Sequence, residues 1–394
     1  MATTTPDAVP LSIRELTADV GFVRRILRGR KWYGTEWYIT VLGGTILVVI
    51  TAATLLAPVV APHDPNEFIG AAFTPPGGGL QTLVARSGES PVAPGAELSG
   101  QTVGVQRNRN GSNLAKELEL DSERYQNQEA LLDGLAGGEV DLIFLDQDVA
   151  KELVTSGSGF EVVIQELGRR YFLGTDNLGR DITSRLTWGA RTVLGVAISS
   201  ALLASVVGIS LGLLSGFAGG RIDRVLSLTM DSIYSFPGLL LAIIMAVMLG
   251  PGIFNVAVAI SVIYIPTFFR IVRGQVLSIK ESLYVEAARS LGAKSRNILR
   301  MYIFPNVIPS VVIVFSLNIA DAILTAAGLS FIGLGLPPDV PDWGYDLSKG
   351  HQFLVAGRWW MITFPGVMIT LVAAGFSLLG EGLSEILNPR LSEN

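Results

Sequence analysis

The sequence predicts an α-helical membrane protein with six transmembrane helices, into which a small α/β domain is inserted. Three observations lead to this fold class. Only 16% of the 394 residues are charged and the mean hydropathy is +0.47, whereas soluble globular proteins carry about 25% charge. Six apolar segments approach or exceed the roughly 20 residues that span a bilayer. Between the first two of these segments, short strand and helix patterns replace the apolar runs.

The apolar segments predict the positions of the six transmembrane helices. They lie at about 39–60, 192–214, 233–250, 252–269, 303–326 and 360–380. Only Gly250-Pro251-Gly252 separates the third and fourth segments, which predicts a tight turn between two antiparallel helices. In the second segment Gly208, Gly212 and Gly216 recur every four residues. Such a row of small residues lets two membrane helices pack at short distance.

Lysine and arginine in the short loops predict the orientation of the helices, because cytoplasmic loops carry an excess of both. Six lie before the first span, two in the 217–232 loop and seven in the 270–301 loop, against none at 250–252 and two at 327–359. The N-terminus, the 270–301 loop and the C-terminus are therefore expected in the cytoplasm. The segment at 62–170 is then outside, and it is acidic, with 17 Asp and Glu against 8 Lys and Arg.

The long outside segment contains the pattern of a small α/β domain. Residues 71–98 are rich in Pro, Gly and Ser, which is typical of a linker. Beyond them, strand patterns alternate with helix patterns, and this alternation predicts a largely parallel sheet. We expect residues 99–167 to fold alone as one unit. Its strands are expected at 102–106, 123–127, 140–146 and 160–167, and its helices at 113–118, 128–135 and 148–154.

A polar, helix-prone stretch, YVEAARSLGAKSRNILRMYIFP at 284–305, lies between the fourth and fifth spans. Ala287, Ala288 and Gly292 place small side chains on neighbouring helical turns, where a partner surface can approach closely. Glu286 can anchor the helix start or pair with a basic residue of a partner. Gly292 is expected to break the stretch into a hairpin of two short helices. On this stretch alone, a solvated face without a partner fits equally well.

The same stretch resembles the EAA loop of ABC-importer permeases, where an ATPase subunit grips the membrane subunit. Tyr302 and Phe304 stand where Ile and Leu are commoner in that family, whereas Pro305 is kept. Further motifs follow in the family's order and resemble the C-type subunit of dipeptide, oligopeptide and nickel permeases. They are YFLGTDNLGRDITSRLTWGARTVL (171–194), GLSFIGLGLPPDVPDWGYDL (328–347) and LLGEGLSEILNPRL (378–391).

This resemblance implies a type I ABC-importer permease fold with six transmembrane helices. We expect a cytoplasmic segment at 1–38, a first helix at 39–61, an extracytoplasmic insertion at 62–170 and a permease core at 171–391 with its coupling loop at 278–305. The implied location is a prokaryotic cell membrane, with lipid around the helices. The implied partners are a second homologous permease subunit, two cytoplasmic ATPase subunits and an extracytoplasmic solute-binding protein, without nucleic acid. ATP and Mg²⁺ are expected on the ATPases, and no cofactor on this chain.

Within the insertion, GQTVGVQRNRNGSNLAKEL and EALLDGLAGGEVDLIFLD resemble one lobe of a type II periplasmic solute-binding protein. The resemblance implies that Asp146 takes a ligand amine. It also implies backbone N–H contacts to a ligand carboxylate from Asn110, Gly111, Ser112 and Asn113. A single lobe lacks the facing half of the cleft, so a docking or scaffold domain that binds no solute tightly is the preferred interpretation. The alternative that Asp146 is an ordinary residue at the end of a strand, without a ligand role, stays open.

Two polar residues inside the fifth span are candidates for the translocation pathway. Asn318 and Asp321 lie three residues apart and therefore on one face of the helix. Polar groups within spans are costly and usually face a cavity, where this carboxylate would meet a substrate amine. A hydrogen bond between helices, or a place near the membrane surface, explains the pair equally well.

Several classes of site are excluded by the residues themselves. No Lys in the chain follows a Gly, so the Gly-Lys-Ser/Thr ending of a nucleotide-binding P-loop cannot occur and ATP hydrolysis is expected on partner subunits. The chain has no cysteine, which excludes disulfides and thiolate chemistry. His63 and His351 are far apart in the sequence, so neither a metal site nor a catalytic residue is expected.

The preferred function is a permease subunit, not itself an enzyme, of an ATP-driven and binding-protein-dependent importer of peptides. Import of a nickel chelate or another small solute by the same kind of subunit is the alternative within the family. A secondary transporter would normally show about twelve spans or inverted repeats. A membrane-anchored solute receptor would use the inserted domain, but it leaves the 284–305 stretch unexplained.

Overall fold

The computed structural model describes residues 22–61, 63–88, 98, 100–156 and 159–387. Residues 1–21 of the expected cytoplasmic segment, and the end of the expected core at 388–391, lie outside the described residues. Five described helices are long and apolar enough to cross a membrane, and a bent pair of helices raises this to as many as six. The five are α1 (Phe22–Leu55), α6 (Ile182–Ala218), α9 (Ile253–Ile279), α12 (Phe304–Phe331) and α14 (Trp360–Leu387).

The third predicted span is not a continuous helix. α7 (Gly220–Tyr234) and α8 (Gly238–Leu249) meet at an angle of 90°, so the expectation of one helix over 233–250 is wrong. The break falls at Pro237, which directly precedes α8. Proline has no N–H for the helical ladder, and its ring disfavours helical geometry in the residue before it.

Glycines shape the bundle where the sequence predicts that they do. Gly250 and Gly252 have φ angles of +77° and +146°, so the tight turn between α8 and α9 is confirmed. In α6, a Cβ atom added at Gly208, Gly212 or Gly216 would lie between 2.6 and 2.9 Å from the nearest atoms of α9. The row of small residues therefore sets how closely α6 and α9 approach, as expected from their spacing.

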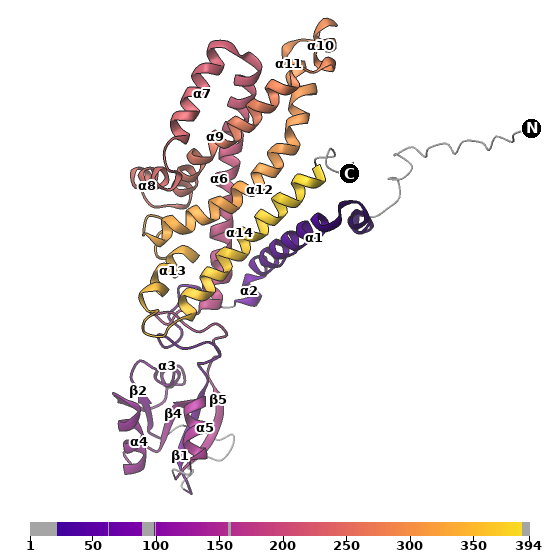
Figure 1. Cartoon of the computed structure of the whole chain (residues 1–394). Helices are drawn as coiled ribbons and strands as arrows, with labels where there is room; N and C mark the ends of the chain where they lie inside the picture. Colours follow the sequence, from indigo (N-terminus) through magenta and orange to yellow (C-terminus); the bar gives the residue numbers. More distant parts are fainter. Residues whose placement is uncertain (1–21, 62, 89–97, 99, 157–158, 388–394) are drawn as a thin grey trace, which may run out of the picture.

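The bundle is elongated, and different elements lie at its two ends (Figure 1). The α/β domain lies at one end, here called the domain end, together with α2 (Ala57–Val60) and α13 (Trp343–Gln352). The short helices α10 (Leu283–Ser290) and α11 (Ser295–Ile298) lie at the opposite end, here called the hairpin end. A π-helical turn, Leu299–Ile303, joins α11 to α12.

The inserted domain contains a five-stranded mixed sheet in the order β3-β2-β4-β1-β5. Strand β1 (Gln81–Arg86) lies in the segment expected to be a linker, and it pairs antiparallel with both β4 and β5. The linker expectation is therefore wrong at this strand, and the sheet is parallel only where β2 pairs with β3 and β4. The other strands are β2 (Val103–Gln106), β3 (Ser122–Tyr125), β4 (Leu142–Asp146) and β5 (Phe160–Leu167).

Helices cover both faces of this sheet. α3 (Asn110–Glu117) packs on one face, where Leu114 meets Leu83 and Phe144. α4 (Gln128–Gly137) and α5 (Gln147–Thr155) pack on the opposite face. The chain therefore leaves β2 toward one face and leaves the neighbouring β4 toward the other.

The central place of β1 predicts which fragment of the domain folds. The expected unit of residues 99–167 omits β1, which lies between β4 and β5 in the described sheet, so the expectation that it folds alone does not fit this domain. Leu83, Val84 and Ala85 of β1 are fully buried, and a fragment of residues 99–167 loses them. We expect a fragment of residues 80–168 to unfold cooperatively on heating, followed by circular dichroism, and the fragment of 99–167 to show no cooperative transition. A cooperative transition of the shorter fragment would show that β1 is dispensable.

Candidate functional site

The stretch at 284–305 forms a helical hairpin that turns at Gly292. This residue has a φ angle of +83°, a left-handed conformation that glycine adopts without a steric penalty. Its N–H donates to the carbonyl of Arg289, and the N–H of Ala293 donates to the carbonyl of Ala288, both at 3.0 Å. These are the two hydrogen bonds of a Schellman motif, which ends α10 before α11 begins.

The hairpin is anchored to the bundle by apolar contacts. Val285 of α10 and Ile298 of α11 are buried in a cluster with Val272 and Val276 of α9 and Val307 of α12. A displacement of the hairpin therefore has to move the ends of α9 and α12, because close-packed side chains transmit such strain.

The small residues of the hairpin do not form the single surface that their spacing suggests. Ala288 is buried against the bundle, whereas Glu286, Ala287 and Gly292 are exposed. The expectation that both alanines face a partner is wrong for Ala288. This residue follows Val285 by three positions, so both lie on the buried face of α10.

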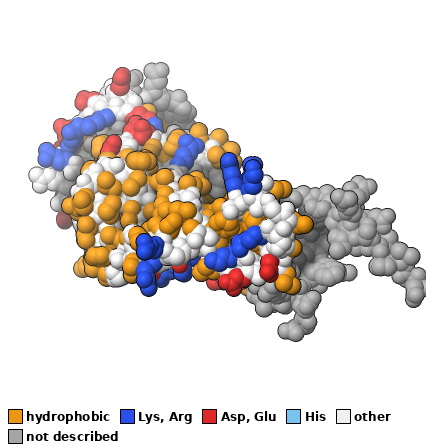
Figure 2. Space-filling model, turned by 90° about the horizontal axis from the view of Figure 1, so that it is seen from above, with side chains coloured by type: hydrophobic (Ala, Val, Ile, Leu, Met, Phe, Trp, Pro, Cys, Tyr) orange, Lys and Arg blue, Asp and Glu red, His pale blue; other side chains and the backbone are white. Residues whose placement is uncertain are grey.

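Two apolar residues that sequence analysis missed lie on the exposed surface of the hairpin. Leu283 is 83% exposed and Leu291 is 88% exposed. Figure 2 looks onto this end of the molecule and shows a largely apolar face with separate groups of Lys and Arg side chains. An exposed apolar surface on a membrane-protein loop is typical of a contact with another protein.

Asn318 and Asp321 line one groove. The groove has a volume of about 480 Å³ and lies between α7, α8, α9 and α12. Asn318 is buried, and its Nδ2 donates to the carbonyl of Val314 at 2.8 Å. Among the described residues, none donates a hydrogen bond or forms an ion pair to the exposed Asp321 carboxylate. This carboxylate is available to a cation in the groove.

Two further residues belong to this polar face, and sequence analysis did not find them. The hydroxyls of Tyr264 on α9 and Thr325 on α12 lie 3.0 Å apart, and Thr325 Oγ1 donates to the backbone carbonyl of Asp321 at 2.9 Å. Tyr264 lines the groove, and the contact joins α9 to α12 beside it. Neither residue is in a motif, so only the packing of the two helices identifies them.

Two ion pairs hold α7 on α9 beside the same groove. The Arg273 guanidinium donates to both carboxylate oxygens of Asp223, at 2.5 and 2.8 Å. Arg270 lies 2.7 Å from Asp231 and 4.0 Å above the ring of Tyr234, which lines the groove. The groove wall on α7 is therefore fixed to α9, the helix that leads into the hairpin.

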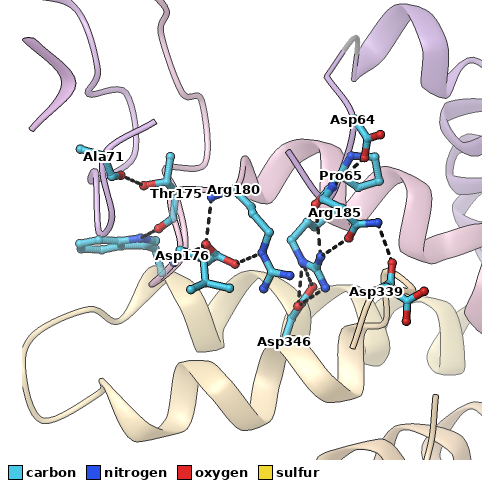
Figure 3. A network of polar contacts seen from close by, with 12 residues as sticks. Asp64, Pro65, Ala71, Thr175, Asp176, Arg180, Arg185, Asp339 and Asp346 are labelled. Atoms are coloured by element: carbon cyan, nitrogen blue, oxygen red, sulfur yellow. Dashed lines mark hydrogen bonds and ion pairs between the residues drawn. The ribbon is translucent and has the colours of Figure 1, made fainter. Parts of the chain in front are cut away.

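A polar network closes the domain end of the bundle (Figure 3). Arg185 of α6 is only 1% exposed, and its guanidinium lies 2.7 Å from Asp346 of α13. Its Nη1 also donates to the carbonyl of Pro65 and to Oδ1 of Asn66, each at 3.2 Å. One buried cation thus joins α6, α13 and the connector, which we define as residues 63–80.

The segment that precedes α6 belongs to this network. Asp176 accepts hydrogen bonds from the backbone and the side chain of Arg180, at 2.9 and 2.6 Å. Gly179 has a φ angle of +78°, and a Cβ there would lie 2.1 Å from the carbonyl oxygen of Gly70. The TDNLGRD part of the 171–194 motif therefore forms a compact turn against the connector.

Asp342 is a second buried acid at this end. One of its oxygens accepts the Gly344 N–H at 2.9 Å and caps α13. The other oxygen has no hydrogen-bond donor within the part of the chain that the structure describes. Burial raises the pKa of Asp342 to about 6, because the hydration that the carboxylate loses outweighs the stabilisation it gains from Ser330, Gly344 and the charge of Arg185.

The insertion uses its expected ligand residues differently. Asn110 Oδ1 accepts the Ala71 N–H at 2.6 Å, and its Nδ2 donates to Thr74 at 3.1 Å, so this side chain ties α3 to the connector. Gly111 packs against Phe144, and Ser112 is buried. Asp146 accepts a hydrogen bond from Gln81 at 2.6 Å and borders a cavity. Of these residues, Asn110 and Asp146 therefore lie together at one cavity, and Gly111 and Ser112 do not border it.

Known proteins match the helical core of this chain. The model of one family, described as the inner membrane component of binding-protein-dependent transport systems, matches residues 208–393. A glutathione transport system permease of Pectobacterium atrosepticum is 42% identical over 221 residues, which are 56% of this chain and 73% of that protein. The chain belongs to the binding-protein-dependent transport permease family.

Other relatives share the same core. A dipeptide transport system permease of Alkalihalophilus pseudofirmus is 37% identical to this permease over 228 residues, covering 58% of this chain and 75% of that protein. An inward-facing structure of the MetNI methionine ABC transporter has a TM-score of 0.44 and 19% identity, covering 52% of this chain and 96% of that chain. The α/β insertion lies outside the residues that the family model matches.

The raised pKa of Asp342 predicts a pH dependence of the permease's stability. The native state holds this proton up to about pH 6, whereas an unfolded chain releases it near the ordinary value of 3.8. The contribution of Asp342 to stability is thus largest below about pH 4 and is lost as the pH rises through 6, by about 1–3 kcal/mol. We expect Asp342→Asn, which keeps an acceptor for Gly344, to remove this part of the pH dependence.

The measurement is the thermal unfolding of the purified permease at pH 4.5 and pH 7. The exposed neighbour Asp339 provides the control, since Asp339→Asn should change with pH as the wild type does. Equal pH dependence of the wild type and Asp342→Asn would contradict the assignment.

Proposed function

We propose that this permease is the membrane subunit of an ATP-driven importer that takes up peptides with the help of a solute-binding protein. The observation that carries the proposal is the exposed hairpin α10–α11, whose buried side is packed onto both α9 and α12. These two helices also line the groove that contains Asp321. A surface for a soluble partner is therefore connected to a polar groove within the helix bundle.

The proposed mechanism uses this connection. Two ATPase subunits dock at the hairpin through Glu286, Ala287, Gly292 and the exposed leucines, and a second permease subunit completes the pathway. Closure of the ATPases on ATP moves the hairpin, and the apolar cluster transmits this movement to α9 and α12. Because two ion pairs hold α7 on α9, the part of the groove that α7 forms moves together with α9.

The peptide substrate is supported by the groove and by the relatives. The Asp321 carboxylate is free to accept the ammonium group of a peptide, a charge-assisted contact that is stronger than a neutral hydrogen bond. Asn318 and Tyr264 add an amide and a hydroxyl to the same face. The relatives are named for transport of glutathione and dipeptides. A nickel chelate or another small solute is the alternative cargo.

We assign the hairpin end to the cytoplasm and the α/β domain to the outside of a prokaryotic cell. The loops rich in Lys and Arg support this orientation. The acidic α/β domain is then placed where a solute-binding protein arrives, and its charge would steer that encounter. ATP and Mg²⁺ belong to the ATPases in this arrangement, and the permease subunit itself is not an enzyme.

Gly292→Arg tests the coupling role. The change strains a residue with positive φ and adds a long side chain where the ATPases would approach. We expect copurification with the ATPases, and peptide uptake into proteoliposomes, to fall at least about tenfold, while insertion into the membrane is retained.

Gly357 offers a matched control for this variant. It has a φ angle of +78° and no atom within 4 Å of an added Cβ, yet it lies at the domain end. Gly357→Arg should therefore bind the ATPases as the wild type does. A Gly292→Arg permease that binds its ATPases and transports normally would refute the assignment of the hairpin.

Asp321→Asn tests the groove. Loss of a charge-assisted contact of about 1.5–3 kcal/mol predicts an uptake KM for a dipeptide that is raised about 10-fold to 100-fold. The N-acetylated dipeptide lacks the ammonium group, so its uptake should change little, and Asp339→Asn should change neither. An equal loss for both substrates would mean that Asp321 supports the helix bundle and does not recognise the amine.

A further inference from the structure

An open cavity lies where the first span ends, at the domain end of the bundle. The apolar part of α1 stops at Leu55, and α2 begins two residues later. The cavity has a volume of about 490 Å³, which is within the roughly 300–1,000 Å³ of small-ligand sites. Its walls come from the α2 region, the connector and α6, through Pro58, Ala61, His63, Asp64, Pro65 and Trp188. Because it follows directly on a span, this cavity lies at the border between the membrane and water.

Two side chains of α6 fix the end of the first span beside the cavity. The Trp188 indole donates to the carbonyl of Ala61 at 3.4 Å, and Arg191 Nε donates to the carbonyl of Thr54 at 3.0 Å. The helical donor to the Thr54 carbonyl would be the backbone nitrogen of residue 58, but this residue is a proline and has no N–H. Arg191 replaces that missing donor, so the guanidinium is held at the cavity.

The guanidinium of Arg191 keeps most of its bonding capacity. It lies 4.4 Å from the centre of the Trp188 ring, an arrangement in which the ring attracts the cation. Arg191 is exposed, and within the described residues no acceptor bonds its Nη1 or Nη2. These two nitrogens form the fork with which arginine bonds two oxygens of a phosphate.

Asp64 adds the opposite charge to the cavity wall. Its Oδ1 accepts the backbone N–H of Asn66 at 2.8 Å, and no donor to its Oδ2 is found among the described residues. The carboxylate attracts an ammonium group and repels a second negative charge. A molecule that carries one phosphate and one ammonium group therefore matches Arg191 and Asp64 together.

The surroundings of the cavity favour a lipid over a water-soluble phosphate. Leu55, Leu56 and Val59 are 70%, 55% and 78% exposed, and they lie at the end of a membrane-spanning helix. Tryptophan is enriched at membrane–water interfaces, where its ring meets the lipid headgroups. Apolar side chains are thus available to hydrocarbon chains next to the charged groups that would hold a headgroup.

We propose that this cavity binds the headgroup of a zwitterionic phospholipid of the phosphatidylethanolamine class. Its phosphate lies at Arg191 and its ammonium group at Asp64, while its chains lie along the exposed residues Leu55 and Val59. A bound lipid would then join α1 to α6 at the place where the chain leaves the membrane for the connector.

Native mass spectrometry of the purified full-length permease in a non-ionic detergent tests the ligand class. Phosphatidylethanolamine is titrated beside phosphatidylglycerol with the same chains, which has the phosphate but no ammonium group. Glycerophosphoethanolamine, which has the headgroup but no chains, is the third ligand. We expect phosphatidylethanolamine to bind at least about tenfold more tightly than either of the others.

Two variants and two matched controls locate the binding. Arg191→Gln should weaken the binding of phosphatidylethanolamine at least about tenfold, and Asp64→Asn should remove the preference over phosphatidylglycerol. Arg170→Gln also removes an exposed arginine that lies over an aromatic ring, that of Phe172, but it is outside the cavity. Glu67→Gln removes an exposed acid of the connector that does not line the cavity. Both controls should bind as the wild type does.

Thermal unfolding of all four variants checks that the bundle is intact. Asp64→Asn keeps an acceptor for the Asn66 N–H, so it tests the site even if Arg191→Gln destabilises the end of α1. The proposal is overturned if the wild type binds both lipids equally, if the headgroup without chains binds as tightly as the lipid, or if Asp64→Asn keeps the wild-type preference. Since no ATPase and no transport step enters the measurement, its outcome does not depend on the proposed import of peptides.

Discussion

The ion pair between Arg185 and Asp346 is the constraint on which the domain end of this permease depends. A guanidinium that is 1% exposed cannot regain its hydration, so its position is set by the few groups that can bond it. Those groups come from α13 and from the connector. Loss of one partner from a buried pair typically costs about 3–5 kcal/mol, because the other charge is left without compensation. The path by which the chain enters the α/β domain is thus tied to the helix bundle.

The hairpin end is organised by apolar packing, with ion pairs only at the side. Val285 and Ile298 bind the hairpin to α9 and α12, while Arg270 and Arg273 bind α7 to α9. The exposed part of the hairpin makes no comparable contacts within the described residues, and its leucines face outward. One side of the hairpin is therefore packed against the helix bundle, and the other side is exposed. This arrangement suits a segment that transmits the movement of a bound soluble partner to the bundle.

The elements that sequence analysis placed wrongly share a physical cause. Strand β1 is six residues long and follows a run rich in proline and glycine, so its local pattern is too short to stand out. Its assignment comes from pairing with β4 and β5, which lie more than fifty residues further along the chain. Ala288 and Ala287 are identical in type, and only the neighbouring cluster decides that one of them is buried. The bend at Pro237 has a local signal, but its 90° angle depends on the helices around it.

By itself the sequence determined that the chain is a helical membrane protein, where its apolar segments lie, that a row of glycines lets the second span pack closely on another helix, and that a small α/β domain is inserted after the first span. These properties follow from local composition and periodicity, which act over one helix or one strand at a time. Only the tertiary structure decided that Asp321 faces a groove with Tyr264, that Asn110 binds the connector, and that Asp64 and Trp188 border one cavity. Such contacts join residues from separate elements, and their positions depend on how the whole chain packs.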